Sequence, residues 1–369
     1  MKRITICLLA ATAFAGTAAL AQGELSYTTS DPIKFPRTIY AGEVAGVATN
    51  SKGHIFVYQR SGNPWIAMGA SRIFTHGGDQ LLEFDQNGNY VKEIGKANYA
   101  ATVANSVRID RQDNIWAVDR TAGMVLKFSP DGLRLLMTLG RKPESINVTI
   151  AGGGAGRGAA PAGEGAAARG AAAPPAGRGG RGGPPGAGSN QDAFPGASDV
   201  AWDAQGNIFV SDGWGTNNRV AKLTPDGVFI KSFGKTGSDN DSLNSPRSLA
   251  TDAAGNVYVA DHDNNRVQVL DNNLNYLRSI TGVGAPWAVC VSSGATQYLY
   301  VSNSNPMDNL DAGGEIYKVQ LNGTVVGRFG KAGKAPREFA TVNQMDCRQP
   351  NTLYTAEAGA YRVQKVVLK

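Results

Sequence analysis

The stretch NIFVSDGWGTNNRV, residues 207–220, returns later in the chain as NVYVADHDNNRV, residues 256–267. In each copy an alternating apolar run ends in aspartate, and a polar turn with Arg-Val follows. A third copy, IDRQDNIWAVD, ends at Asp119, and weaker copies start at Val47, Cys290 and Met345. Self-similarity at a fixed spacing is the signature of a repeat architecture, so the chain is expected to contain six equivalent units.

Each unit predicts four short antiparallel strands. In the third unit, the expected strands are rich in β-branched and aromatic residues and are separated by turns with Gly, Asn or Pro-Asp-Gly. Those strands cover residues 199–203, 208–211, 220–223 and 228–233. Three hairpin turns in a repeat of about 45 residues are typical of a propeller blade. We therefore predict an all-β fold, a six-bladed β-propeller.

The last unit ends at Lys369 after only three strands. An open ring would leave unpaired strand edges on its first and last blades. We expect the segment 25–29, near the start of the chain, to supply the missing fourth strand and close the ring.

Residues 1–21 have the pattern of a secretory signal peptide, because Lys2 and Arg3 precede an apolar run that ends in Ala-Leu-Ala. This pattern predicts a secreted or periplasmic protein. Blades one and two with the closing strand are expected in 22–151, and blades three to six in 189–369. Residues 152–188 between them are nearly all Gly, Ala, Pro and Arg, which predicts a disordered insertion. The insertion is either a passive surface linker or a tether to an anionic cell-wall polymer.

The net charge of +6 does not describe the folded part. Lys2 and Arg3 contribute two of these charges, and the insertion contributes three, which leaves +1. There is no basic stripe of the kind that binds nucleic acid, and no further apolar run long enough to span a membrane. We expect neither nucleic acid nor integral membrane association, and a monomer.

Two cysteines, Cys290 and Cys347, follow the signal segment. In an oxidising compartment they pair as a disulfide or remain two small buried thiols, and the sequence leaves both options open. They lack the spacing of a zinc site.

Propeller geometry predicts where a ligand pocket would form. The loop that enters each innermost strand and the loop after each second strand lie on one face, so their residues converge on the channel mouth. The residues expected at this mouth to bind a ligand are Arg60, Asn105, Trp214, Arg247, His262, Trp287 and Asn343. Arg120 and Glu357 occupy equivalent places. Arginine forks that hold a carboxylate are one interpretation of this set, and polar channel residues around trapped water are the other.

Asp119, Asp212 and Asp261 recur at one position of the repeat, which indicates a structural role. Each is expected to accept hydrogen bonds from its own turn, and two are expected to pair with Arg219 and Arg266. No catalytic residue is assigned, and the residues themselves predict no cofactor.

The motifs VAGVATNSKGHIFVYQR, IDRQDNIWAVD, VSDGWGTNNRV and SPRSLATDAAGNVYVAD resemble the NHL-repeat propellers, and among them the peptidyl-α-hydroxyglycine α-amidating lyases. This resemblance implies zinc held by three histidines, a tyrosine base and two arginines. The histidine places fall on Asn105, Arg247 and Asn343 and the tyrosine place on Trp214. Arg60 matches one arginine, and His262 stands at the other place.

The resemblance also implies a structural calcium bound by backbone carbonyls that match Val47 and Val107. Gln344 stands at its carboxylate place. Zinc and calcium are therefore expectations of the resemblance alone, and asparagine and arginine are poor zinc ligands. The sequence favours an exported propeller that binds a small anionic or peptidic ligand at the channel mouth. The alternatives are a divergent amidating-lyase-like enzyme and a scaffold for another exported protein.

Overall fold

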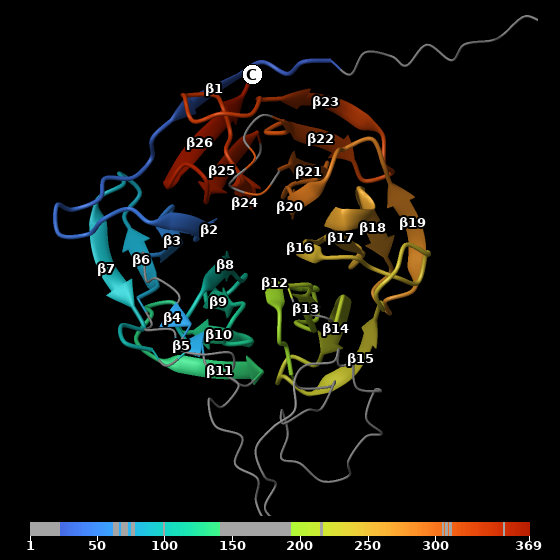
Figure 1. The fold of residues 1–369 in the computed structure, drawn as a ribbon, viewed down its shortest axis with the longest axis horizontal. Helices are drawn as coiled ribbons and strands as arrows, with labels where there is room; N and C mark the ends of the chain where they lie inside the picture. Colours follow the sequence, from blue (N-terminus) through green and yellow to red (C-terminus); the bar gives the residue numbers. More distant parts are fainter. Residues whose placement is uncertain are drawn as a thin grey trace, which may run out of the picture.

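The computed structural model describes residues 23–61, 66–67, 73–74, 78–98, 100–140, 193–214, 217–304, 306, 309, 312–349 and 351–369. Within them, six four-stranded antiparallel sheets form a closed ring with one short strand of each sheet at the centre (Figure 1). This confirms the predicted six-bladed β-propeller. The predicted signal peptide 1–21 and the predicted insertion 152–188 lie outside the described residues.

The strands follow one another from the centre of the ring outward in blades one to five. Blade one contains β2 (Glu43–Thr49), β3 (Ile55–Arg60), β6 (Gln80–Phe84) and β7 (Tyr90–Ile94). Blade two contains β8 (Ala104–Ile109), β9 (Ile115–Asp119), β10 (Met124–Phe128) and β11 (Leu135–Gly140). Blade three contains β12 (Ala197–Trp202), β13 (Ile208–Asp212), β14 (Arg219–Leu223) and β15 (Phe229–Phe233).

The second half of the ring repeats this order. Blade four contains β16 (Pro246–Thr251), β17 (Val257–Asp261), β18 (Arg266–Leu270) and β19 (Tyr276–Ile280), and blade five β20 (Pro286–Val291), β21 (Tyr298–Asn303), β22 (Ile316–Gln320) and β23 (Val325–Phe329). Blade six contains β24 (Val342–Gln349), β25 (Thr352–Glu357), β26 (Arg362–Leu368) and β1 (Tyr27–Ser30). A small hairpin of β4 (Ile66–Ala67) and β5 (Ile73–Phe74) and one 3₁₀ turn, η1 (His262–Asn264), complete the described elements.

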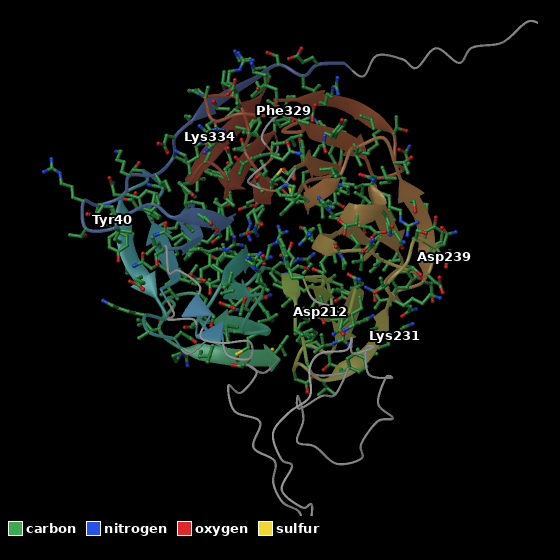
Figure 2. The ribbon with its side chains drawn as sticks, in the orientation of Figure 1. Tyr40, Asp212, Lys231, Asp239, Phe329 and Lys334 are labelled. Carbon is green, nitrogen blue, oxygen red and sulfur yellow. A yellow bond between two sulfur atoms is a disulfide. The ribbon has the colours of Figure 1, made fainter. Side chains whose placement is uncertain are left out.

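The core is divided among the blade interfaces. Each of the six buried apolar clusters in the described residues joins two neighbouring blades. Between blades two and three, for example, Trp116 stacks on Trp202 with 5.3 Å between ring centroids. In Figure 2, Asp212 lies inside the ring, whereas Lys231 and Asp239 lie on its outer rim. A single sheet buries little by itself, and the ring buries both faces of every sheet.

The ring closes as the sequence predicted. β1 pairs antiparallel with β26, and Tyr27 lies opposite Leu368. The Tyr27 ring is buried 4.9 Å from the Phe329 ring, and its hydroxyl donates to the carbonyl oxygen of Arg337 at 2.6 Å. The first described strand therefore completes the last blade.

Aspartates hold the turn between the first and second strands. In blade three, Oδ1 of Asp203 accepts the backbone N–H groups of Gln205 and Asn207, both at 2.9 Å. Gly206 in this turn has a φ of +86°, which a glycine adopts without strain. Asp110 and Asp252 hold the same turn in blades two and four. The repeated Asp-x-x-Gly-Asn pattern is thus a local backbone device.

The second recurring aspartate is also structural, as predicted. Asp119 is buried and accepts four backbone N–H groups, two from its own turn and two from the loop that enters β8. Asp212 pairs with Arg219 at 3.4 Å and Asp261 with Arg266 at 2.7 Å. These carboxylates fix the loops at the channel mouth.

Glu357 corrects one expectation. It was placed with the residues of the channel mouth, but it is fully buried in blade six and pairs with Arg362 at 3.1 Å. It also accepts the backbone N–H of Ala340, from the loop before β24, at 3.1 Å. Glu357 therefore does in blade six what the recurring aspartates do in blades two to four.

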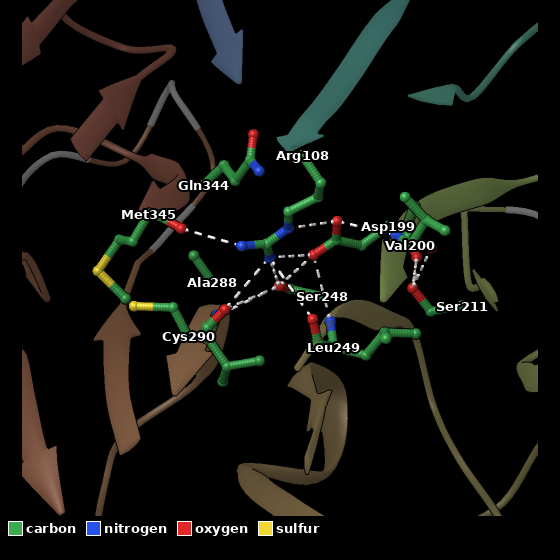
Figure 3. Close-up of polar contacts among 12 residues, drawn as sticks. Arg108, Asp199, Val200, Ser211, Ser248, Leu249, Ala288, Cys290, Gln344 and Met345 are labelled. Atoms are coloured by element: carbon green, nitrogen blue, oxygen red, sulfur yellow. Dashed lines mark hydrogen bonds and ion pairs between the residues drawn. The ribbon is translucent and has the colours of Figure 1, made fainter. Parts of the chain in front are cut away.

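A guanidinium group at the centre of the ring links the inner strands of several blades (Figure 3). Arg108 on β8 donates to both carboxylate oxygens of Asp199 on β12, at 3.0 and 2.5 Å. The same group donates to the carbonyl oxygen of Val289 in blade five at 3.3 Å and of Met345 in blade six at 3.1 Å. It also reaches the hydroxyl of Ser248 in blade four at 3.3 Å. One side chain of blade two therefore contacts the inner strands of four other blades.

A disulfide joins the inner strands of two neighbouring blades. Cys290 and Cys347, on the inner strands of blades five and six, form a disulfide with Cα atoms 6.1 Å apart. This decides between the two options that the sequence left open.

In the part of the chain that the structure describes, no helix has the length and apolar character needed to cross a membrane.

Candidate functional site

A cavity of about 710 Å³ opens at the end of the channel where the inner strands begin. We call it the mouth pocket. Loops from all six blades contribute to its wall, as propeller geometry predicted. Its principal side chains are Glu43, Arg60, Asp79, Arg120, Trp214, Arg247, Trp287, Asn343 and Tyr361. Five of the seven predicted site residues therefore line one pocket, and Asn105 and His262 lie next to it.

Arg247 and two tryptophans form one wall of the mouth pocket. The guanidinium carbon of Arg247 lies 3.6 Å from the ring centroid of Trp214 and 5.0 Å from that of Trp287. The two indole rings meet edge to face at 5.9 Å. Nε and Nη1 of Arg247 are shielded from solvent and have no hydrogen-bond partner among the described residues. The guanidinium of this wall thus lies on an aromatic surface with two of its nitrogen atoms unpaired in the described residues.

Two more guanidinium groups belong to the same pocket. Arg60 donates to Glu43 at 2.9 Å and to the carbonyl oxygen of Ala104 at 2.8 Å, while its Nη2 has no partner in the described residues. Arg120 lies over the Trp214 ring at 4.4 Å. Burial, together with the charges of Arg60 and Arg247, lowers the pKa of Arg120 to about 10. Burial likewise lowers the pKa of Arg247 to about 10. Both groups still carry their charge at neutral pH.

Asp79, like Glu43 and Tyr361, is a pocket residue that could not be predicted from the sequence. It lies just before β6, in the connection between β3 and β6, which is longer than the equivalent connection of any other blade. Its Oδ2 accepts the backbone N–H of Ala104. Burial raises the pKa of Asp79 to about 7, despite this hydrogen bond and the positive charges of Arg60 and Arg120. No periodic pattern marks a single aspartate in a long connection, so only the three-dimensional structure identifies it.

Asn343 lines the pocket, Asn105 lies next to it, and both side chains bond to backbone. Asn343 donates to the carbonyl oxygens of Ala45 and Asn105 at 2.5 and 2.7 Å, and accepts the indole N–H of Trp287 at 3.1 Å. Asn105 donates to the carbonyl oxygen of Ser198 at 2.5 Å. These amides hold the inner strands and position Trp287.

His262 lies behind the tryptophan wall, in the 3₁₀ turn η1. Its ring packs edge to face on Trp287 at 5.0 Å, and Nδ1 contacts Asp263 at 2.6 Å. Nε2 is buried and has no partner among the described residues. His262 therefore supports Trp287 and keeps one nitrogen available.

The side chains at the implied zinc place do not fit a zinc ion. Asn343 already uses its amide in three hydrogen bonds, and Arg247 is a cation that would repel the metal. Across the described ranges, no three His, Cys, Asp or Glu side chains gather into a possible metal site. No step that needs zinc is therefore derived for this pocket.

The implied calcium place does not fit either. Oε1 of Gln344 accepts the backbone N–H groups of Val47 and Val107 at 3.1 and 3.0 Å, and its Nε2 donates to the carbonyl oxygen of Val107 at 2.5 Å. A neutral amide that makes three protein hydrogen bonds replaces the carboxylate that calcium prefers.

The opposite end of the channel holds a smaller cavity of about 250 Å³. Its charged groups already have protein partners. Arg108 pairs with Asp199, Asp346 accepts the backbone N–H and hydroxyl of Thr49, and Arg348 donates to the carbonyl oxygen of Ile109. The mouth pocket, with its unpaired donors, is the better candidate site.

Comparisons with known proteins agree with this architecture. The NHL repeat family model matches residues 243–270. Peptidylglycine α-amidating monooxygenase of Rattus norvegicus is 23% identical over 207 residues, which is 53% of this chain and 17% of the rat protein. The mouse protein is also 23% identical, over 206 residues. The chain thus aligns with about a sixth of the length of these relatives.

Solved structures share the fold at low identity. A streptogramin B lyase has a TM-score of 0.53 at 13% identity, covering 93% of this chain and 98% of the lyase. An inactive virginiamycin B lyase of Staphylococcus aureus, solved with quinupristin, gives 0.53 at 10%, with 93% and 100% coverage. A protein of unknown function from Bacteroides thetaiotaomicron gives 0.59 at 11%, with 94% and 77% coverage. The chain is a six-bladed β-propeller that carries an NHL repeat and is weakly similar in sequence to peptidylglycine α-amidating monooxygenases.

Proposed function

We propose that this protein is exported and binds a small anionic ligand, a carboxylate with an apolar portion, in the mouth pocket. One observation carries the proposal. Two N–H groups of Arg247 are shielded from solvent and unpaired within the described residues, and the guanidinium lies on two indole rings. A buried donor without a partner costs about 1–3 kcal/mol, which a ligand oxygen would recover.

The chemistry of the pocket supports a carboxylate. Guanidinium presents a planar fork of donors that matches a carboxylate in two parallel hydrogen bonds. Three arginines line the pocket against two carboxyl groups, and one of those, Glu43, is already paired with Arg60. The volume of about 710 Å³ lies in the range of about 300–1,000 Å³ that is usual for small-molecule sites. A short peptide with a free C-terminus has the required charge and size.

The tryptophans support an apolar portion in the ligand. Trp214 and Trp287 form an aromatic wall, and Trp287 is fixed by Asn343 and His262. Indole rings give a large contact area at little cost in side-chain entropy. We expect ligands with an aromatic or aliphatic side chain beside the carboxylate to bind best.

Isothermal titration calorimetry with N-acetyl-phenylalanine and with its amide tests the proposal, since the two differ only in the carboxylate. The acid should bind and the amide should not. Loss of one partner of a desolvated ion pair costs about 2 kcal/mol or more, so Arg247→Gln should weaken binding of the acid at least about thirtyfold. Lys231→Gln, on the outer rim, should bind as the wild type does. Equal affinity for acid and amide, or normal binding by Arg247→Gln, would rule the proposal out.

A divergent amidating-lyase-like enzyme is the second candidate. The sequence similarity to the amidating monooxygenases favours it, because it covers 53% of this chain. The residues at the zinc place argue against it. Incubation with N-benzoyl-α-hydroxyglycine separates the candidates: a lyase releases benzamide and glyoxylate, whereas a binding protein retains the compound unchanged.

A further inference from the structure

Asp79 is the one carboxyl group of the mouth pocket that makes no ion pair with another described residue, yet it belongs to the arginine cluster. It reaches the pocket from blade one, beside Arg60 on β3 and Arg120 after β9, and is mostly buried. Both arginine charges act on it in the direction that favours its ionised form. An ionised Asp79 therefore partly neutralises the arginine charges that would otherwise attract a ligand carboxylate.

The other charged or titratable groups near Asp79 are few. The charge of Asp119 helps to raise the pKa of Asp79, and the charges of both aspartates help to raise the pKa of Tyr58. The pocket adds Tyr40, Glu43, Tyr361 and Arg247, with His262 behind Trp287. Glu43 is paired with Arg60, and Asp119 is held by four backbone N–H groups. Asp79 is thus the carboxyl group to consider for a change of charge near neutral pH.

We propose that ligand binding in the mouth pocket is coupled to protonation of Asp79, so that the pocket captures a carboxylate together with one proton. This inference rests on the proposed function. The proton comes from solvent and adds to Oδ of Asp79, and no other bond forms or breaks. The protonated side chain no longer competes for Arg60 and Arg120, and its O–H becomes a donor toward the bound anion.

The size of the effect follows from the titration of Asp79. With a pKa of about 7, Asp79 is protonated in most molecules at pH 6 and in few at pH 8. The apparent affinity falls with the fraction of binding-competent molecules, so it should drop about tenfold between these pH values. A bound anion also raises the pKa of Asp79 further, since like charges disfavour ionisation. Binding at pH 7 should then take up about half a proton.

Calorimetry with N-acetyl-phenylalanine at pH 6, 7 and 8 tests this inference, because the probe remains ionised throughout. At pH 7 the titration is repeated in two buffers of different ionisation enthalpy, which gives the number of protons taken up. The wild type should show the tenfold loss and the proton uptake. Asp79→Asn has a neutral side chain of the same shape, so its affinity should not change with pH and should exceed that of the wild type about tenfold at pH 8.

His262→Gln is the matched control, and it should keep the pH dependence whatever its affinity. A wild type that binds the acid equally at pH 6 and 8 would overturn the coupling and leave the proposed function standing. A pH dependence that persists in Asp79→Asn and disappears in His262→Gln would mean that His262 takes up the proton. That result would also overturn the coupling to Asp79. Failure of the acid to bind at any of the three pH values would refute both proposals.

Discussion

Replacement of Arg108 by methionine should destabilise the propeller more than any surface substitution. Arg108 donates to both oxygens of Asp199 and to groups on blades four, five and six. The side chain of Asp199 is 1% exposed, so Arg108→Met leaves a buried carboxylate without its cation. Removal of one partner of a buried ion pair costs about 3–5 kcal/mol. We expect a loss of this size in the free energy of unfolding.

A double-substitution cycle separates the charge from the packing. Asp199→Asn removes the negative charge but keeps its shape, and the pair Arg108→Met with Asp199→Asn leaves no buried charge uncompensated. The double variant should therefore recover part of the loss, because replacement of both partners of a buried pair costs far less than removal of one. Exposed Arg134→Met is the control and should change stability by less than about 0.5 kcal/mol.

Urea unfolding followed by circular dichroism gives the free energies, and thermal melting should show a fall in Tm of roughly 10 °C for Arg108→Met. The double variant should fold and melt between the single variant and the wild type. If the free energy of unfolding of Arg108→Met lay within about 1 kcal/mol of the wild-type value, the guanidinium would not hold the blades together. A double variant that is less stable than either single variant would contradict the reasoning as well.

Four further outcomes are expected. Loss of the disulfide in a Cys290→Ala, Cys347→Ala double variant should cost about 4 kcal/mol, as the entropy model gives for a 57-residue separation, and urea unfolding measures it. Tyr27→Ala should cost about 3–5 kcal/mol because a buried ring in the closing strand is lost; a change below 1 kcal/mol by the same assay would contradict this. Excess EDTA should leave Tm unchanged, because Gln344 fills the implied calcium place with protein hydrogen bonds; a lower Tm would reveal a structural cation. Asp79 has a pKa raised above its usual 3.8, so the stability from its neutral form is present at low pH and is lost as pH rises from about 4 to 7; Asp79→Asn should match the wild type at pH 4 and melt higher at pH 8.

Much of the fold could be predicted from the sequence because its signals are local and repeated. The Asp-x-x-Gly-Asn turn, the alternating run and the terminal aspartate each act within one blade, and they occur often enough to be aligned. Ring closure by β1 followed from the missing strand of the last blade. The same reasoning placed Arg60, Trp214 and Arg247 on one pocket, since equivalent positions of a propeller converge on one face.

The residues that were missed or misplaced lie where the repeat gives no information. Asp79 is in the connection between β3 and β6, which is the longest connection between a second and a third strand in the six blades. Arg108 is one of many residues on inner strands, and its contacts come from four other blades, which no local pattern reveals. Glu357 was assigned to the mouth because blade six replaces aspartate by glutamate at the end of its second strand, and the substitution hid the equivalence.

The closure of the ring has a consequence for how the protein is made. Tyr27 pairs with Leu368, so the two partners of this contact are separated by nearly the whole chain. Blades one to five can form one after another during synthesis, since each is built from strands that follow one another along the chain. Blade six must wait for β26 and then recruit β1. The propeller therefore remains an open arc until β26 has been synthesised and pairs with β1.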